Sequence, residues 1–114
     1  MEITMRYRSN VLVVTLKGEL DHHTADGLRQ TVEKELDKDI AQHVLLNLSG
    51  LKFMDSSGLG VILGRYRRLS AQGGRMAACS LHPHIERLYE LSGLPKIIPV
   101  YATEDAALTE LRRE

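Results

Sequence analysis

The feature that most constrains the fold of this 114-residue chain is a pair of nearly unbroken apolar runs, at residues 11–16 and 43–48. Runs of this kind, rich in valine and leucine, are typical of strands that are covered on both faces. The segment between the runs carries apolar residues at the spacing of a surface helix: Ala25, Leu28, Val32 and Leu36. The order strand, helix, strand favours parallel pairing through a right-handed crossover.

The flanking segments predict the remaining elements of an α/β fold. Residues 3–8 alternate between apolar and polar side chains, which predicts a half-buried strand in a hairpin with residues 11–16, and Gly18 is expected to close the second strand. Further along, we expect a strand around Cys79, a helix that begins near Pro83, an edge strand over residues 97–101 and a last helix capped by Thr103. We find no linker, and the chain is expected to be a single domain over residues 1–114.

The composition argues against several classes of function. Lysine plus arginine and aspartate plus glutamate both number 15, so the overall basic charge typical of nucleic-acid binding is absent. No apolar run approaches the roughly 18 residues of a membrane span, and the first residues lack the pattern of a signal peptide. We therefore expect a cytoplasmic protein with no nucleic-acid or membrane partner, in which the lone Cys79 is a buried small apolar residue.

A polar stretch follows the first apolar run and contains Glu19, Asp21, His22, His23 and Thr24. Asp21 or Thr24 is predicted to cap the helix that begins after it. A metal site needs ligands that converge in space, whereas adjacent histidines on a helix would point apart. The stretch therefore predicts a capping loop, and we expect neither a metal nor a cofactor there.

A second polar stretch, Asp55-Ser56-Ser57-Gly58 within residues 51–60, is predicted to be a turn that leads into a helix. The helix is indicated by apolar residues at spacings of three and four: Leu59, Ile62, Leu63, Tyr66 and Leu69. A serine or aspartate ahead of this pattern is an N-cap signal, and the unpaired N–H groups at a helix start favour a phosphate. Near the end of this helix, Arg65, Arg67 and Arg68 are expected to form a solvated basic face, the alternative being contact with an acidic partner.

The residues alone leave four interpretations of this stretch open. A nucleotide loop would need a lysine after its last glycine, and none follows. A hydrolase would need an imidazole beside Ser56; His22 or His23 could come near it, but the Gly-x-Ser-x-Gly spacing is absent. In the third interpretation one hydroxyl caps the helix while its neighbour accepts a phosphoryl group. In the fourth, both serines only cap.

The residues 18–25 and 53–66, together with 91–94 and 96–98, resemble the STAS domain, and within it the anti-sigma factor antagonists of endospore formation. The resemblance spans nearly the whole chain. It implies a single STAS domain, with a mixed β-sheet of four to five strands and about four α-helices packed against it. It also implies a protein without catalytic activity and without a cofactor.

The resemblance further implies a phosphorylation switch. The unmodified protein would bind an anti-sigma factor, itself a serine kinase that carries ATP, and so free the sporulation sigma factor F. The kinase would phosphorylate Ser56 and release the antagonist, and a PP2C-type serine phosphatase would restore binding. Partner-binding residues implied by the matching motifs are Glu19, Asp21, His22, Asp55, Ser57 and Gly58. Alternatives within the family are a general-stress or other regulator of a different anti-sigma kinase, and a nucleotide-binding module.

Overall fold

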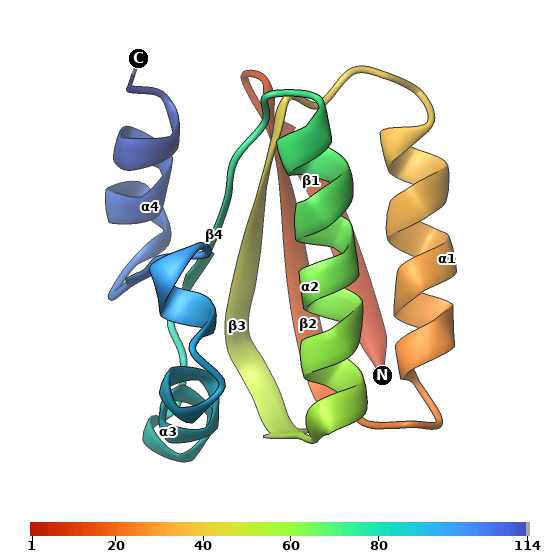
Figure 1. The fold of residues 1–114 in the computed structure, drawn as a ribbon, viewed down its shortest axis with the longest axis vertical. Coiled ribbons are helices and arrows are strands. Elements are labelled where there is room, and N and C mark those ends of the chain that lie inside the picture. Colours follow the sequence, from red (N-terminus) through yellow and green to blue (C-terminus); the bar gives the residue numbers. More distant parts are fainter. Residues whose placement is uncertain (114) are drawn as a thin grey trace.

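The computed structural model describes residues 1–113 and shows one five-stranded sheet with helices packed against it (Figure 1). The strands lie side by side in chain order: β1 (Glu2–Arg8), β2 (Val11–Leu20), β3 (His43–Met54), β4 (Met76–Cys79) and β5 (Val100–Tyr101). The first two strands form an antiparallel hairpin, and every later neighbour pairs in parallel. The sheet is therefore mixed, as predicted.

Four α-helices and a 3-10 turn occur within the described residues: α1 (Ala25–Leu36), α2 (Ser56–Ala71), α3 (Pro83–Leu91), η1 (Leu94–Lys96) and α4 (Glu104–Leu111). Two predicted helix starts are confirmed. Pro83 is at the first position of α3, and the Thr103 hydroxyl caps α4 by accepting the N–H of Ala106 at 3.1 Å. Glu114, the last residue of the domain expected over residues 1–114, lies outside the described residues.

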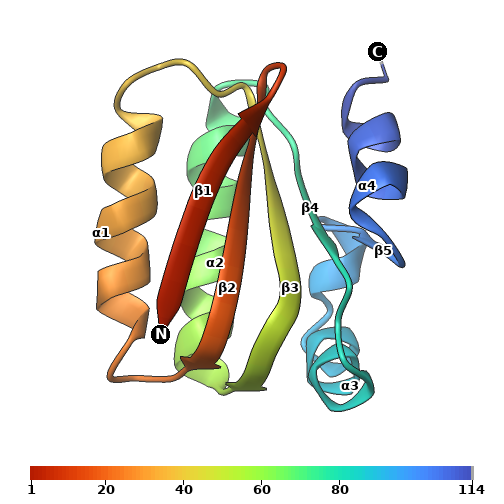
Figure 2. The ribbon, with the colours of Figure 1, turned by 180° about the vertical axis from the view of Figure 1, so that it is seen from behind.

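The helices cover both faces of the sheet, which gives two apolar cores (Figures 1 and 2). On one face α1 and α2 lie side by side, and the predicted stripe of α1 is buried against β2 and β3. On the other face α4 packs against the sheet, where Cys79 is fully buried as predicted. Buried apolar residues of α4 that contribute to this second core are Ala107, Leu108 and Leu111.

Strands β2 and β3 are longer than predicted. Instead of ending near Gly18 and residue 48, they continue in parallel to Leu20 and Met54, so residues 51–54, just before the predicted turn, belong to β3. The register shifts twice along this extension, once after Thr15 and once after Gly18, and each shift adds one residue to β3. Gly18 has a φ of 115°, a conformation that glycine adopts readily, so it accommodates an irregular pairing rather than stopping the strand.

Strand β5 is shorter than the predicted run over residues 97–101. It contains only Val100 and Tyr101, because the chain just before it turns through η1. Its predicted place at an edge of the sheet is confirmed, since it pairs with β4 alone. Pro99, which has no N–H to donate, precedes the strand.

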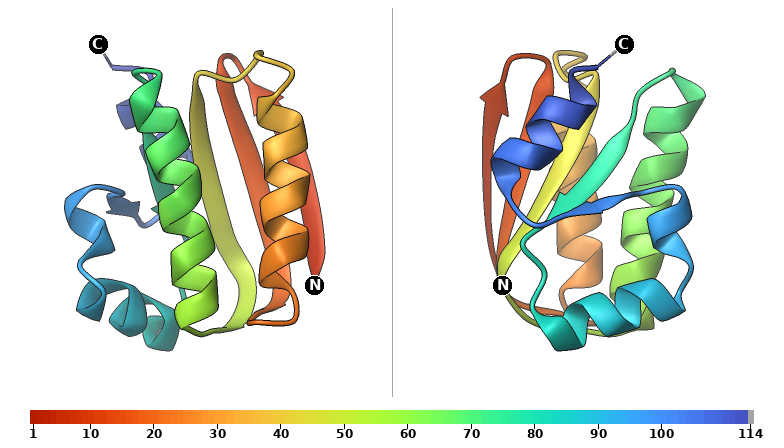
Figure 3. Two further views of the ribbon diagram at one scale, coloured as in Figure 1. Left: turned by 45° about the vertical axis from the view of Figure 1, so that its right-hand side comes forward. Right: turned by 90° about the vertical axis from the view of Figure 1, so that its left-hand side faces the viewer.

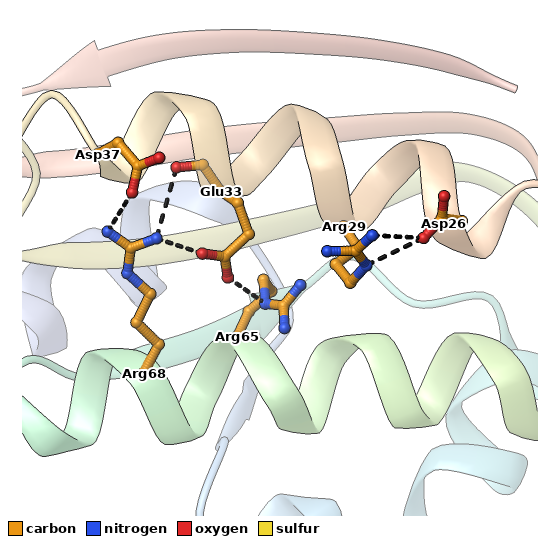
Figure 4. A network of polar contacts seen from close by, with 6 residues as sticks. All are labelled: Asp26, Arg29, Glu33, Asp37, Arg65 and Arg68. Atoms are coloured by element: carbon orange, nitrogen blue, oxygen red, sulfur yellow. Dashed lines mark hydrogen bonds and ion pairs between the residues drawn. The ribbon is translucent and has the colours of Figure 1, made fainter.

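An ion-pair network joins α1 to α2 (Figure 4). Arg65 Nε lies 2.8 Å from Glu33 Oε1, and Arg68 contacts both Glu33 and Asp37. The prediction of a solvated basic face is therefore wrong for Arg65 and Arg68, and holds only for the exposed Arg67. The crossover connection places both helices on one face of the sheet, so cations of α2 meet carboxylates that lie about thirty positions earlier in the chain.

Candidate functional site

The two polar stretches meet at one end of the sheet (Figure 3). Because β2 and β3 are parallel, their last residues, Leu20 and Met54, are aligned, and the segments that follow them leave the same edge. The N–H of Asp55 donates to the carbonyl oxygen of Leu20 at 3.2 Å, which fixes the first residue after β3 to the last residue of β2. The loop of residues 21–24 and the start of α2 therefore belong to one surface.

Asp55, rather than a serine, caps α2. Its backbone is extended, and its Oδ1 accepts the N–H groups of Ser57 at 2.9 Å and Gly58 at 3.4 Å. The predictions in which a serine hydroxyl caps the helix are therefore wrong. The helix already begins at Ser56, so the residue in the N-cap position is the aspartate before it. Ser56 is exposed and Ser57 is partly buried.

Gly58 is a buried residue in the first turn of α2, where it lies against Leu20 and Met54. A Cβ atom added to it would lie 2.7 Å from Leu20 Cγ and 2.9 Å from Met54 Cγ, closer than side chains normally approach. Only a glycine therefore lets the first turn of α2 rest on the ends of β2 and β3. The sequence reasoning missed the role of Leu20 and Met54; the only signal for Leu20 was that it is apolar between Glu19 and Asp21.

The loop that follows β2 is closed by its own side chains. Asp21 Oδ1 accepts the N–H groups of His23 at 2.9 Å and Thr24 at 3.1 Å. The Thr24 hydroxyl accepts the N–H of Asp21 at 3.0 Å and donates to the carbonyl oxygen of Glu19 at 2.9 Å. Thr24 is at the N-cap position of α1, but no side-chain bond caps this helix, so the predicted capping is replaced by bonds within the loop.

The hydrogen bonds of the loop also set the charge of Asp21. Partial desolvation by itself would raise the pKa of this carboxyl, but the N–H groups of His23 and Thr24 outweigh it and hold the pKa below its ordinary value. Asp21 is therefore ionised at neutral pH. Together with Glu19 and Asp55 it places three carboxylates in the two segments at this end of the sheet.

His22 and His23 are exposed and lie in a turn rather than on a helix. Their ring centroids are 3.9 Å apart, so the expectation that the two rings point apart is wrong. Within residues 1–113, no group of three or more histidine, cysteine, aspartate or glutamate side chains is arranged to hold a metal ion.

A hollow of about 500 Å³ lies near the opposite end of α2, where Tyr66, Gly73 and Glu110 are among its lining residues, and it is separate from this site.

Comparisons with known proteins identify the class. The STAS domain family model matches residues 2–107. The anti-sigma F factor antagonist of Paenibacillus polymyxa is 49% identical over 111 residues, which cover 97% of this chain and 95% of that protein. The chain therefore belongs to the STAS domain family, and it is similar over nearly its whole length to an anti-sigma factor antagonist.

Solved structures agree with this assignment. The unphosphorylated form of the anti-sigma factor antagonist SpoIIAA superposes with a TM-score of 0.77 at 28% identity, over 99% of this chain and all of that one. The phosphorylated form of SpoIIAA from Bacillus gives a TM-score of 0.76 at 31% identity, over 97% of this chain and all of that one.

Among residues 1–113, no helix has the length and apolar character needed to cross a bilayer.

Proposed function

We propose that this chain is an anti-sigma factor antagonist controlled by phosphorylation of Ser56. In its unmodified form it binds an anti-sigma factor serine kinase, which carries the ATP, and so releases the sporulation sigma factor F. The kinase transfers a phosphoryl group to the Ser56 hydroxyl, and the antagonist is then released. A PP2C-type serine phosphatase removes the group in the cytoplasm, and the antagonist itself catalyses no reaction.

The observation that carries the proposal is the position of Ser56. It is exposed, it begins α2, and its hydroxyl is not needed as a cap because Asp55 supplies that bond. A kinase can therefore reach the hydroxyl without unfolding the helix. The similarity to an anti-sigma F factor antagonist, and to a protein whose structure is known both with and without phosphate, supports the same role.

Electrostatics explains how one phosphoryl group could end binding. It adds a charge of about −1.5 to −2 at pH 7. The partial positive charge at the start of α2 offsets part of this addition, so the fold is retained. The same group lies beside the Asp55 carboxylate and at the same end of the sheet as Glu19 and Asp21. A partner surface that fits the unmodified site would then meet a strongly negative patch and an added bulky group.

The implied docking residues divide by exposure. Glu19 and His22 are exposed, and Asp21, Asp55 and Ser57 are partly buried, so we assign contact with the partner chiefly to the first two and to Ser56. The carboxylates of Asp21 and Asp55 hold the two segments in shape through bonds to backbone N–H groups. Gly58 contributes by its lack of a side chain rather than by contact.

The test uses the anti-sigma F factor of Paenibacillus polymyxa with Mg-ATP, followed by peptide mapping of the added mass. We expect one phosphoryl group on Ser56. Ser56→Ala should form a complex that persists in ATP, and Ser56→Asp should bind weakly, because its charge resembles the released state. Ser57→Ala and Ser57→Asp are the matched controls at the neighbouring position. Equal binding by Ser56→Asp and the unmodified protein, or a phosphoryl group found only on Ser57, would contradict the proposal.

A further inference from the structure

The second half of β3 has strand pairing on one side only. Strand β4 pairs with Val44–Asn47 and goes no further, whereas β2 accompanies β3 to its end. At the two register shifts between β2 and β3, the residues of β3 without an aligned residue in either neighbour are Leu48 and Ser49 at the first shift and Lys52 at the second. Residues added in this way at a bulge normally lack ladder hydrogen bonds, so the carbonyl groups of the exposed Ser49 and Lys52 are available to side chains or to water.

Two histidines at the start of α3 supply those partners. His82 Nε2 lies 2.7 Å from the Ser49 carbonyl oxygen, and His84 Nε2 lies 2.8 Å from that of Lys52. Because a carbonyl oxygen only accepts, Nε2 is the protonated, donating nitrogen in both rings. The rings are stacked with centroids 6.1 Å apart and planes 20° apart. One imidazole therefore bonds to a backbone carbonyl group at each of the two register shifts of β3.

We infer that His82 and His84 are positioning residues for Ser56, an inference that rests on the proposed function. Lys52 is only four residues before Ser56, and Met54, between them, supports Gly58 in the first turn of α2. Without the two imidazoles, the backbone of β3 beyond Asn47 would have β2 as its only pairing strand, and the buried Leu51 and Met54 would be its anchors in the core. The histidines replace the missing strand on the other side and so limit the positions that Asp55 and Ser56 adopt when a kinase approaches.

The contacts that His82 and His84 make with β3 do not involve the docking residues. Neither ring bonds to Asp55, Ser56 or the loop of residues 21–24 in the part of the chain that the structure describes. Their effect on Ser56 therefore passes through the backbone of residues 49–55. The consequence is that α3, which the proposed docking surface does not include, influences how efficiently Ser56 is phosphorylated.

The test compares two double variants. His82→Ala with His84→Ala removes both donors, whereas His82→Gln with His84→Gln keeps an N–H at a similar reach. Arg87→Ala, exposed on the same helix, is the control. For each protein we would measure amide hydrogen exchange over residues 49–57, with the amides of α1 as the internal reference for folding. We would also measure kcat/KM for phosphorylation of Ser56 by the Paenibacillus polymyxa anti-sigma F factor.

We expect the alanine pair to exchange faster over residues 49–57 and to lose roughly tenfold in kcat/KM, as when a reacting group is held less precisely. The glutamine pair should recover most of both values, and Arg87→Ala should match the parent. Unchanged exchange in the alanine pair, or faster exchange with an unchanged kcat/KM, would overturn the inference. If the parent itself is not phosphorylated, the proposed function fails, and with it the role toward Ser56. The exchange data then decide separately whether the imidazoles hold β3.

Discussion

The N–H of Asp55 donates to the Leu20 carbonyl oxygen across 3.2 Å, joining two residues that are 35 positions apart in the chain. This bond sets the spacing between the loop after β2 and the start of α2. The carboxylate of Asp55 then caps the helix on which Ser56 stands. One residue thus connects the sheet, the helix and the proposed phosphoacceptor, and several consequences of this arrangement can be measured.

Replacing Asp55 should cost stability through the lost cap. Asp55→Ala leaves the N–H groups of Ser57 and Gly58 without their acceptor, so the free energy of unfolding should fall by about 1 kcal/mol. Asp55→Asn keeps an oxygen in the same place and should lose only a few tenths of that amount. Urea denaturation of the three proteins measures the difference, and equal losses for alanine and asparagine would show that the cap is not what stabilises the helix.

Two glycines of α2 should respond oppositely to alanine. Gly58→Ala forces a Cβ against Leu20 and Met54 and should lower the free energy of unfolding by about 1–3 kcal/mol. Gly60→Ala meets no atom within 4 Å, so it should raise that free energy by up to about 1 kcal/mol through helix propensity. Thermal or urea unfolding of both variants tests the pair. A Gly58→Ala protein as stable as the parent would mean that Leu20 and Met54 shift aside at little cost.

Acid should destabilise the protein through His43. This side chain is buried, its Nδ1 accepts the N–H of Arg75 at 2.9 Å, and burial, aided by the Arg75 charge, lowers its pKa. The neutral form is thus favoured by folding. Its contribution is complete above the unfolded pKa of about 6.5 and is lost as pH falls from there toward the folded value, by no more than about 1.4 kcal/mol per pH unit.

His43→Asn isolates this contribution, because an asparagine oxygen can accept the Arg75 N–H without titrating. The free energy of unfolding, measured by urea at pH 8 and pH 5.5, should fall less in the variant than in the parent. The exposed His22, His23, His82 and His84 remain in both proteins and serve as the common background. An identical fall in both would assign the pH dependence to other groups.

A second acid-sensitive contact is Glu104, the first residue of α4. It accepts hydrogen bonds from Arg6 and Asn47, and Arg8 lies 3.6 Å away. The Arg6 bond is the main reason that the pKa of Glu104 is lowered. Its contribution is therefore present above the unfolded pKa of about 4.3 and is lost as pH falls through the folded value.

Glu104→Gln should accordingly be less stable than the parent at pH 7 and should lose less stability between pH 6 and pH 3. Differential scanning calorimetry across this range measures both effects. Glu90→Gln, exposed on α3, is the matched control and should keep the acid-side loss of the parent. If Glu104→Gln loses as much on acidification as the control does, then Glu104 does not hold α4 to β1 and β3 by its charge.

Local features were readable without the structure. The apolar stripe of α1, the start of α3 at Pro83 and the cap at Thr103 each depend on residues within about four positions of one another. The same holds for the placement of Ser56 at the beginning of a helix. Even here the choice between serine and aspartate as the cap was open, because it depends on which residue takes the first helical φ and ψ.

The amino-acid sequence by itself determined the order of strands and helices, their buried faces and the polar segments after β2 and β3, because these follow from periodicity and short-range hydrogen bonds. Only the tertiary structure decided the two register shifts of β3, the pairing of Arg65 and Arg68 with α1, the support of Gly58 by Leu20 and Met54, and the bonds from His82 and His84. Each of these joins residues that are far apart in the chain and that become neighbours only when the strands pair and the helices pack.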